Sequence, residues 1–216
     1  MRFALSKDHL DFFYQNHFIE LEDLFTEDHI EGLRQSVEEV LIARIGASRD
    51  PKKVFLHGQN AYKDHPMIKK TVFNKNLASI ASELTKIRTL RLASDQILAG
   101  NLVEDPLFKT EIPLRDLSSL SPLRCGAVIH IAASKELIDP LPKKPGRVTF
   151  FSPRLPISFD YLSNTPSLLQ LMIFYGSEPL TYTLTPSDPH THDLKKQGYA
   201  FGDPIERSVC PVVIQP

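Results

Sequence analysis

The apolar run from Cys125 to Ala133 places the strongest constraint on the fold of this 216-residue chain. The run contains one polar residue, His130, and polar segments lie on both sides of it. A run of this length between polar segments predicts a buried β-strand. The polar turn before it contains Asp116, so the stretch Pro113–Ala133 predicts a turn leading into a rigid strand. Such an arrangement is suited to presenting a binding site.

The order of the expected elements narrows the fold class. Helical periodicity and helix-capping residues occur early in the chain, whereas strand patterns dominate from Thr89 onward. Helices followed by strands predict an α+β protein, with a β-sandwich or barrel flanked by N-terminal helices. We expect one domain, 1–216, with a mainly helical flank (1–88) and a strand-rich core (89–216).

Local patterns predict the individual elements. The expected helices are Lys7–Tyr14 capped by Ser6, a long helix capped by Thr26 and ended near Ile45 and Gly46, and a third helix capped by Asn76; Val54–Lys70 is expected to be irregular. A brief strand is expected at His17–Glu20. The later expected strands are Thr89–Ala93, Ile97–Ala99, Arg124–Ala133, Arg147–Ser152, Leu168–Tyr175, Leu180–Thr185 and Val209–Ile214.

Composition excludes several classes of function. The net charge is −1, so neither nucleic acid nor an anionic membrane surface is an expected partner. Cys125 and Cys210 lie in apolar runs without CxxC spacing, which favours a reducing compartment. The first residues carry charges where a signal peptide would be apolar. The run Leu168–Tyr175 is too short for a membrane span, which needs about 20 residues. We therefore expect a cytoplasmic protein.

Four segments of the chain resemble phytanoyl-CoA dioxygenase-like proteins, and they occur in the same order. They are LSKDHLDFFYQNHFIELEDLFTEDHIEGLRQSVEEVL, NKNLASIASELTKIRTLRLASDQIL with its Asp95-Gln96 pair, GRVTFFSPRLPISFDYLSN, and LLQLMIFYG. That family belongs to the Fe(II)/2-oxoglutarate oxygenases. The resemblance implies a double-stranded β-helix core (a jelly roll, cupin-like) with flanking N-terminal helices. It also implies an iron site built from His-x-Asp and a later His, and an Arg that anchors 2-oxoglutarate.

The residues that would carry this chemistry are largely missing. The His-x-Asp position falls on Leu114 and Asp116, and the later His falls near Ile157. There is no histidine between Pro66 and Ile129, and neither Arg nor Lys occurs from Leu155 to Leu194. The resemblance therefore predicts a degenerate member, a pseudoenzyme that binds neither Fe(II) nor 2-oxoglutarate. Its expected role is to bind a small molecule or a protein.

Three other interpretations remain open. His190, His192 and Asp193 are an alternative metal site, although flanking prolines and lysines indicate an exposed loop. An active oxygenase with displaced ligands would combine Asp116 with the His190/His192 pair. A metal-responsive regulator is disfavoured because no basic helix or helix-turn-helix pattern is evident. His130, inside the predicted strand, needs a hydrogen-bond partner and is expected in the core or lining the pocket.

Overall fold

The computed structural model describes residues 4–47, 50–100, 111–133, 137, 141–163, 165–186 and 188–215. Its helices are α1 (Lys7–Asn16), α2 (Glu27–Ile45), α3 (Pro51–His57), α4 (Pro66–Val72) and α5 (Lys75–Thr85), with short 3-10 helices η1 (Ala61–Lys63), η3 (Leu114–Asp116), η4 (Asp160–Ser163) and η5 (Leu194–Gln197). Its strands are β1 (Phe18–Leu21), β2 (Leu90–Ala99), β3 (Glu111–Pro113), β4 (Leu120–Ala132), β5 (Val148–Phe151), β6 (Pro156–Ser158), β7 (Leu169–Tyr182) and β8 (Val212–Ile214). The helices therefore precede most of the strands as predicted, and β1 lies between α1 and α2 close to the brief strand expected at His17–Glu20.

Most of the predicted helix ends are confirmed. The side chains of Ser6 and Thr26 cap α1 and α2, and Gly46 follows the last residue of α2. The third cap was predicted at the wrong residue. Asn74 caps α5 by accepting hydrogen bonds from the backbone N–H groups of Asn76 (2.8 Å) and Leu77 (3.3 Å). Asn76 instead lies inside the first turn.

The expectation of irregular structure over Val54–Lys70 is wrong. Helices α3 and α4 occupy most of this segment, and each begins with a proline, Pro51 and Pro66. Proline is favoured in the first helical turn because its missing N–H would have no helical partner there. The prolines therefore start these helices. Gly58 then lets the chain pass close to the sheet, since a Cβ atom at this position would lie 2.8 Å from the carbonyl oxygen of Ile97.

Six strands form one antiparallel sheet in the order β1-β5-β4-β7-β2-β8, and β3 pairs with β6 in a second, two-stranded sheet. The predicted strands Thr89–Ala93 and Ile97–Ala99 form one continuous strand, β2. The predicted strands Leu168–Tyr175 and Leu180–Thr185 likewise form one strand, β7. The polar residues Ser94, Asp95 and Gln96 lie buried within β2, so they do not interrupt it. The last strand is shorter than predicted and covers Val212–Ile214.

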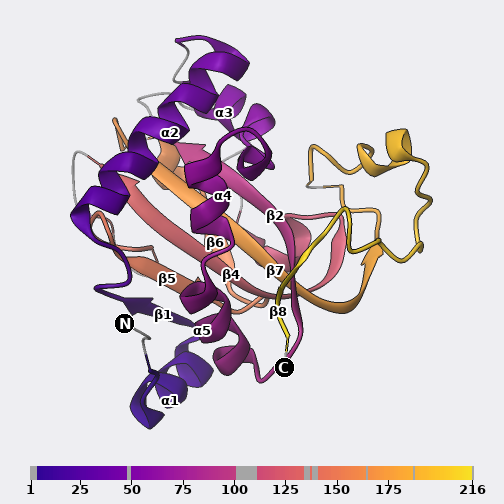
Figure 1. Ribbon diagram of the computed structural model, residues 1–216, viewed down its shortest axis with the longest axis horizontal. Coiled ribbons are helices and arrows are strands. Elements are labelled where there is room, and N and C mark those ends of the chain that lie inside the picture. The colour runs from indigo at the N-terminus through magenta and orange to yellow at the C-terminus, as the bar shows by residue number, and fades with distance from the viewer. Residues whose placement is uncertain are drawn as a thin grey trace.

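Helices cover one face of the curved large sheet (Figure 1). Side chains alternate along each strand, so one apolar cluster joins Ile129, Leu171 and Ile97 to the helices. A second cluster on the opposite face joins Val128, Met172 and Leu98 to Ile157 of the small sheet. We call the space between the two sheets the barrel interior. The α+β class with flanking N-terminal helices is confirmed. No helix in the described part of the chain has the length and apolar character of a membrane span.

Packing of α2 against the sheet can be tested with two neighbouring residues. Leu41 is 2% exposed, whereas Ile42 is 61% exposed. We expect Leu41→Ala to lower the free energy of unfolding by about 2–5 kcal/mol because it leaves a cavity. Ile42→Ala should change it by less than about 0.5 kcal/mol. Urea denaturation followed by circular dichroism measures both values, and equal effects would contradict the assigned face of α2.

Candidate functional site

The fold brings the predicted metal-site positions to one small sheet, in a turn that follows β3 and on the neighbouring strand β6. In the small sheet, Pro113 of β3 pairs with Pro156 of β6, and Ile112 pairs with Ile157. Leu114 follows β3 directly and begins η3, which ends at Asp116. The Leu114–Asp116 turn and Ile157 therefore lie at the same small sheet, although they are far apart in the sequence. Their descent from iron ligands remains a prediction.

These positions do not provide a set of iron ligands. Leucine and isoleucine have no donor atoms, and Ile157 is buried in the apolar cluster of the barrel interior. The side chain of Asp116 is 49% exposed, and its Oδ1 lies 3.8 Å from Nε of Arg115. Across the described residues, no three His, Cys, Asp or Glu side chains gather into a metal-binding group. One carboxylate is thus available where the facial triad needs three ligands, and Fe(II) does not fit these residues.

The alternative metal site in the C-terminal loop can be examined in the same way. His190 pairs with Asp193, with 2.9 Å between Nδ1 and Oδ2. His192 is exposed, and its ring centroid lies 6.1 Å from that of Phe201. Neither the set His190, His192 and Asp193 nor the set with Asp116 forms a metal-binding group among the described residues. His190 is partly buried, so the loop is less exposed than its prolines and lysines suggest.

His130 lies fully buried on the interior face of β4, directly opposite Gln170 of β7. Its Nδ1 is 2.7 Å from the carbonyl oxygen of Pro142. A carbonyl only accepts, so Nδ1 carries the proton of the neutral ring and Nε2 is an acceptor. Nε2 is buried and has no partner among the described residues. Burial lowers the pKa of this imidazole, and the hydrogen bonds to Pro142 and Ala132 oppose that effect.

Sequence reasoning missed the polar residues around His130. Gln170 is fully buried, and its Oε1 accepts a hydrogen bond from the Tyr161 hydroxyl (2.9 Å). This bond directs the amide nitrogen of Gln170 away from Tyr161, and that nitrogen has no described partner. The hydroxyl of Thr149 on β5 is also buried without a described partner. A usable signal was present, because Gln170 and Thr149 are isolated polar residues within apolar strands.

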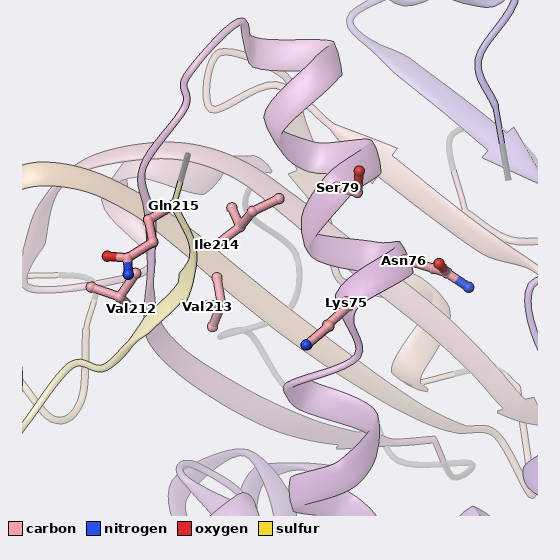
Figure 2. A pocket seen from close by; sticks show the side chains of 7 residues that line it. All are labelled: Lys75, Asn76, Ser79, Val212, Val213, Ile214 and Gln215. Carbon is pink, nitrogen blue, oxygen red and sulfur yellow. The ribbon is translucent and has the colours of Figure 1, made fainter. Parts of the chain in front are cut away.

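A groove with a volume of ≈ 590 Å³ lies away from the barrel interior. Figure 2 shows it between α5, which contributes Lys75, Asn76 and Ser79, and the C-terminal residues Val212 to Gln215. Lys75 is its only charged lining residue among those described. A single exposed cation beside an edge strand offers no acid–base pair, so this groove is not the candidate site.

The buried state of His130 can be tested by the pH dependence of stability. An unfolded histidine has a pKa near 6.5, and the folded pKa of His130 lies below it. Below about pH 6.5 the unfolded state therefore binds more protons, and stability falls as pH decreases toward the folded pKa. Urea denaturation above and below pH 6.5 should show a larger acid loss for the native chain than for His130→Leu. Equal losses would mean that His130 titrates normally.

No protein-family model and no curated protein matches this sequence. Solved structures do match it. The non-heme α-ketoglutarate-dependent epimerase SnoN from nogalamycin biosynthesis superposes with a TM-score of 0.71 at 12% identity, covering 97% of this chain and 98% of SnoN. The carbocyclase SnoK from the same biosynthesis gives 0.62 at 19% identity, with 96% of each chain covered. EctD from S. alaskensis, solved with 2-oxoglutarate and 5-hydroxyectoine, gives 0.59 at 12% identity, covering 98% of this chain and 85% of EctD.

At these sequence identities, the structural likeness to SnoN, SnoK and EctD shows the fold alone. The predicted jelly-roll, cupin-like core of the 2-oxoglutarate oxygenases, with its flanking helices, is confirmed.

Proposed function

We propose that this protein is a non-catalytic member of the oxygenase fold that acts as a ligand- or protein-binding module. The observation that carries the proposal is the hydrocarbon side chain of Ile157, which is 3% exposed at the position expected for the distal iron ligand. With Leu114 at the first ligand position, Asp116 is the single donor left. We place the chain, on its segment order, in a degenerate phytanoyl-CoA dioxygenase-like branch, as one cytoplasmic domain.

The residues around His130 support the loss of the cosubstrate as well. The anchoring Arg is expected about a dozen residues after Ile157, and the polar side chain that faces the barrel interior there is Gln170. Its amide is neutral, and burial favours the neutral form of His130. Arg147 lies at the edge of this region but pairs with Glu20 (2.5 Å) and Glu22 (2.7 Å). Among the described residues of this region, Gln170 and His130 supply no cation and Arg147 is already paired, so a dicarboxylate is disfavoured in this apolar interior.

A binding measurement tests the proposal directly. Fe(II) and 2-oxoglutarate are titrated into the native chain under anaerobic conditions and followed by calorimetry and electronic absorption. We expect no saturable binding of the pair, because two metal ligands and the cosubstrate anchor are missing. Tight stoichiometric binding of both would refute the proposal and revive an oxygenase with displaced ligands.

A restoration experiment tests the assignment of the positions themselves. The double variant Leu114→His, Ile157→His supplies two imidazoles to the small sheet that carries Asp116. We expect its affinity for Co(II), measured by visible absorption, to exceed that of the native chain by roughly tenfold or more. Adding Asp116→Ala should remove most of this gain. A folded double variant, checked by circular dichroism, with no gain in affinity would show that these positions do not converge.

A further inference from the structure

A second pocket lies where the C-terminal loop folds against the end of the large sheet. Its volume is ≈ 170 Å³. The lining comes from the turn Gln59–Lys63, from Ala93 and Ser94 of β2, from the residues 118–120 that enter β4, and from the loop after β7. In Figure 1 this loop, drawn in yellow, projects beyond the strand ends. Ala93, Leu120 and Cys210 of the lining belong to the apolar cluster of the barrel interior, so the pocket lies at one end of that interior. Its described lining does not include Leu114, Asp116 or Ile157.

The loop beside the pocket is held in place by buried hydrogen bonds. Asp188 accepts a hydrogen bond from the backbone N–H of Ser119 (2.7 Å), and the Ser119 hydroxyl donates to Oγ1 of Thr191 (2.7 Å). The hydroxyl of Tyr182 on β7 donates to the carbonyl of Thr191. Asp188 also accepts from the backbone N–H of His190 (2.8 Å). These bonds fix the backbone that carries His190 relative to β4 and β7.

His190 lines this pocket and has one ring nitrogen without a described partner. Its Nδ1 lies 2.9 Å from Oδ2 of Asp193, whose Oδ1 accepts from Nζ of Lys196 (2.8 Å). The hydrogen bonds from Lys196 and His190 lower the pKa of the Asp193 carboxyl, so the carboxylate is ionised and accepts the proton of Nδ1. The other ring nitrogen, Nε2, is left for a further hydrogen-bond partner. It is buried and has no partner among the described residues.

Ser94 gives the pocket a second unpaired polar group. This residue is 3% exposed, and its hydroxyl has no hydrogen-bond partner among the described residues. It comes from β2, whereas His190 comes from the loop, so the two groups belong to different walls of the pocket. Lys63 contributes a cation to the lining, and Asp188 and Asp193 contribute carboxylates. A ligand must satisfy both unpaired groups in the presence of charges of both signs.

From these groups we propose that the pocket binds a small neutral polyhydroxy compound. Hydroxyl groups can pair with Nε2 of His190 and with the hydroxyl of Ser94, because a hydroxyl is both donor and acceptor. A carboxylate would be repelled by Asp188 and Asp193. An ammonium cannot accept from Ser94 and would be repelled by Lys63. The volume corresponds to about six water molecules at about 30 Å³ each, which matches a molecule of the size of glycerol.

The test uses glycerol as the probe and the neighbouring histidine as the matched control. Glycerol is titrated into the isotopically labelled native chain and its variants. The backbone amide NMR signals of Ser119 and Asp193 in the lining are followed in every protein, together with the imidazole signals of His190 where that residue is present. We expect saturable shifts in the native chain and in His192→Gln, because His192 is exposed and outside the described lining. His190→Gln should weaken binding about tenfold, the cost of one lost hydrogen bond in a buried site, and Ser94→Ala should weaken it several-fold.

Charged probes complete the design. Acetate and ethylammonium should give no saturable shift of the His190 signals. Saturable binding of either ion that exceeds glycerol binding would overturn the assignment of a neutral ligand. Equal glycerol binding by the native chain and by folded His190→Gln and Ser94→Ala, or no binding by the native chain, would overturn the site. These outcomes are independent of the Fe(II) and 2-oxoglutarate titration, which concerns Leu114, Asp116, Ile157 and Gln170 and none of the residues changed here.

Discussion

The large sheet is buried on both faces, and this constraint governs every polar residue in its central strands. All ten residues of β2 are buried, so their polar side chains must find partners inside the protein. Asp95 does so by accepting hydrogen bonds from the backbone N–H groups of Ala61 (2.9 Å) and Tyr62 (3.3 Å). Burial raises the pKa of this carboxyl to about 7, and the two backbone donors oppose the rise. Gln96 likewise donates to the carbonyl of Phe55 (3.0 Å). The Asp95-Gln96 pair therefore joins the helical layer to the sheet.

Polar side chains in the barrel interior also need hydrogen-bond partners, but fewer partners are present there. Gln170 and Tyr161 satisfy one another in part, and the carbonyl of Pro142 satisfies one nitrogen of His130. The groups left over are neutral, and apolar side chains such as Met172 and Phe174 surround the remaining space. A neutral interior of this kind is compatible with a stable core, since an unpaired buried charge would cost far more than an unpaired neutral group. The proposed loss of iron chemistry and the packing of the interior therefore point in the same direction.

Sequence patterns predicted the parts of the fold that depend on local physics. Ser6, Thr26 and Gly46 mark helix ends because capping is decided within a few residues. The same patterns failed where tertiary contacts decide. Ser94 to Gln96 look like a break in a strand, yet the helical layer and the C-terminal loop bury them and β2 continues. The expected break before Leu180 fails for a related reason, because β7 stays paired with β4 as far as Tyr182.

The candidate sites also differ in whether local sequence or tertiary contacts determine them. A resemblance alone suggested Leu114, Asp116 and Ile157 as former metal-site positions, and this assignment stays a prediction. The pairing of β3 with β6 places the three residues at one small sheet. The contact between His190 and Asp193 lies within one turn, yet the pocket beside it also needs Ser94, about a hundred residues earlier in the chain. No periodicity links such residues; the curvature of the sheet and the return of the loop bring them together. A loop anchored on a rigid sheet can acquire a new binding site without altering the core. If the small sheet has lost its metal chemistry as proposed, the groups proposed to recognise a ligand are those of the second pocket, His190 and Ser94.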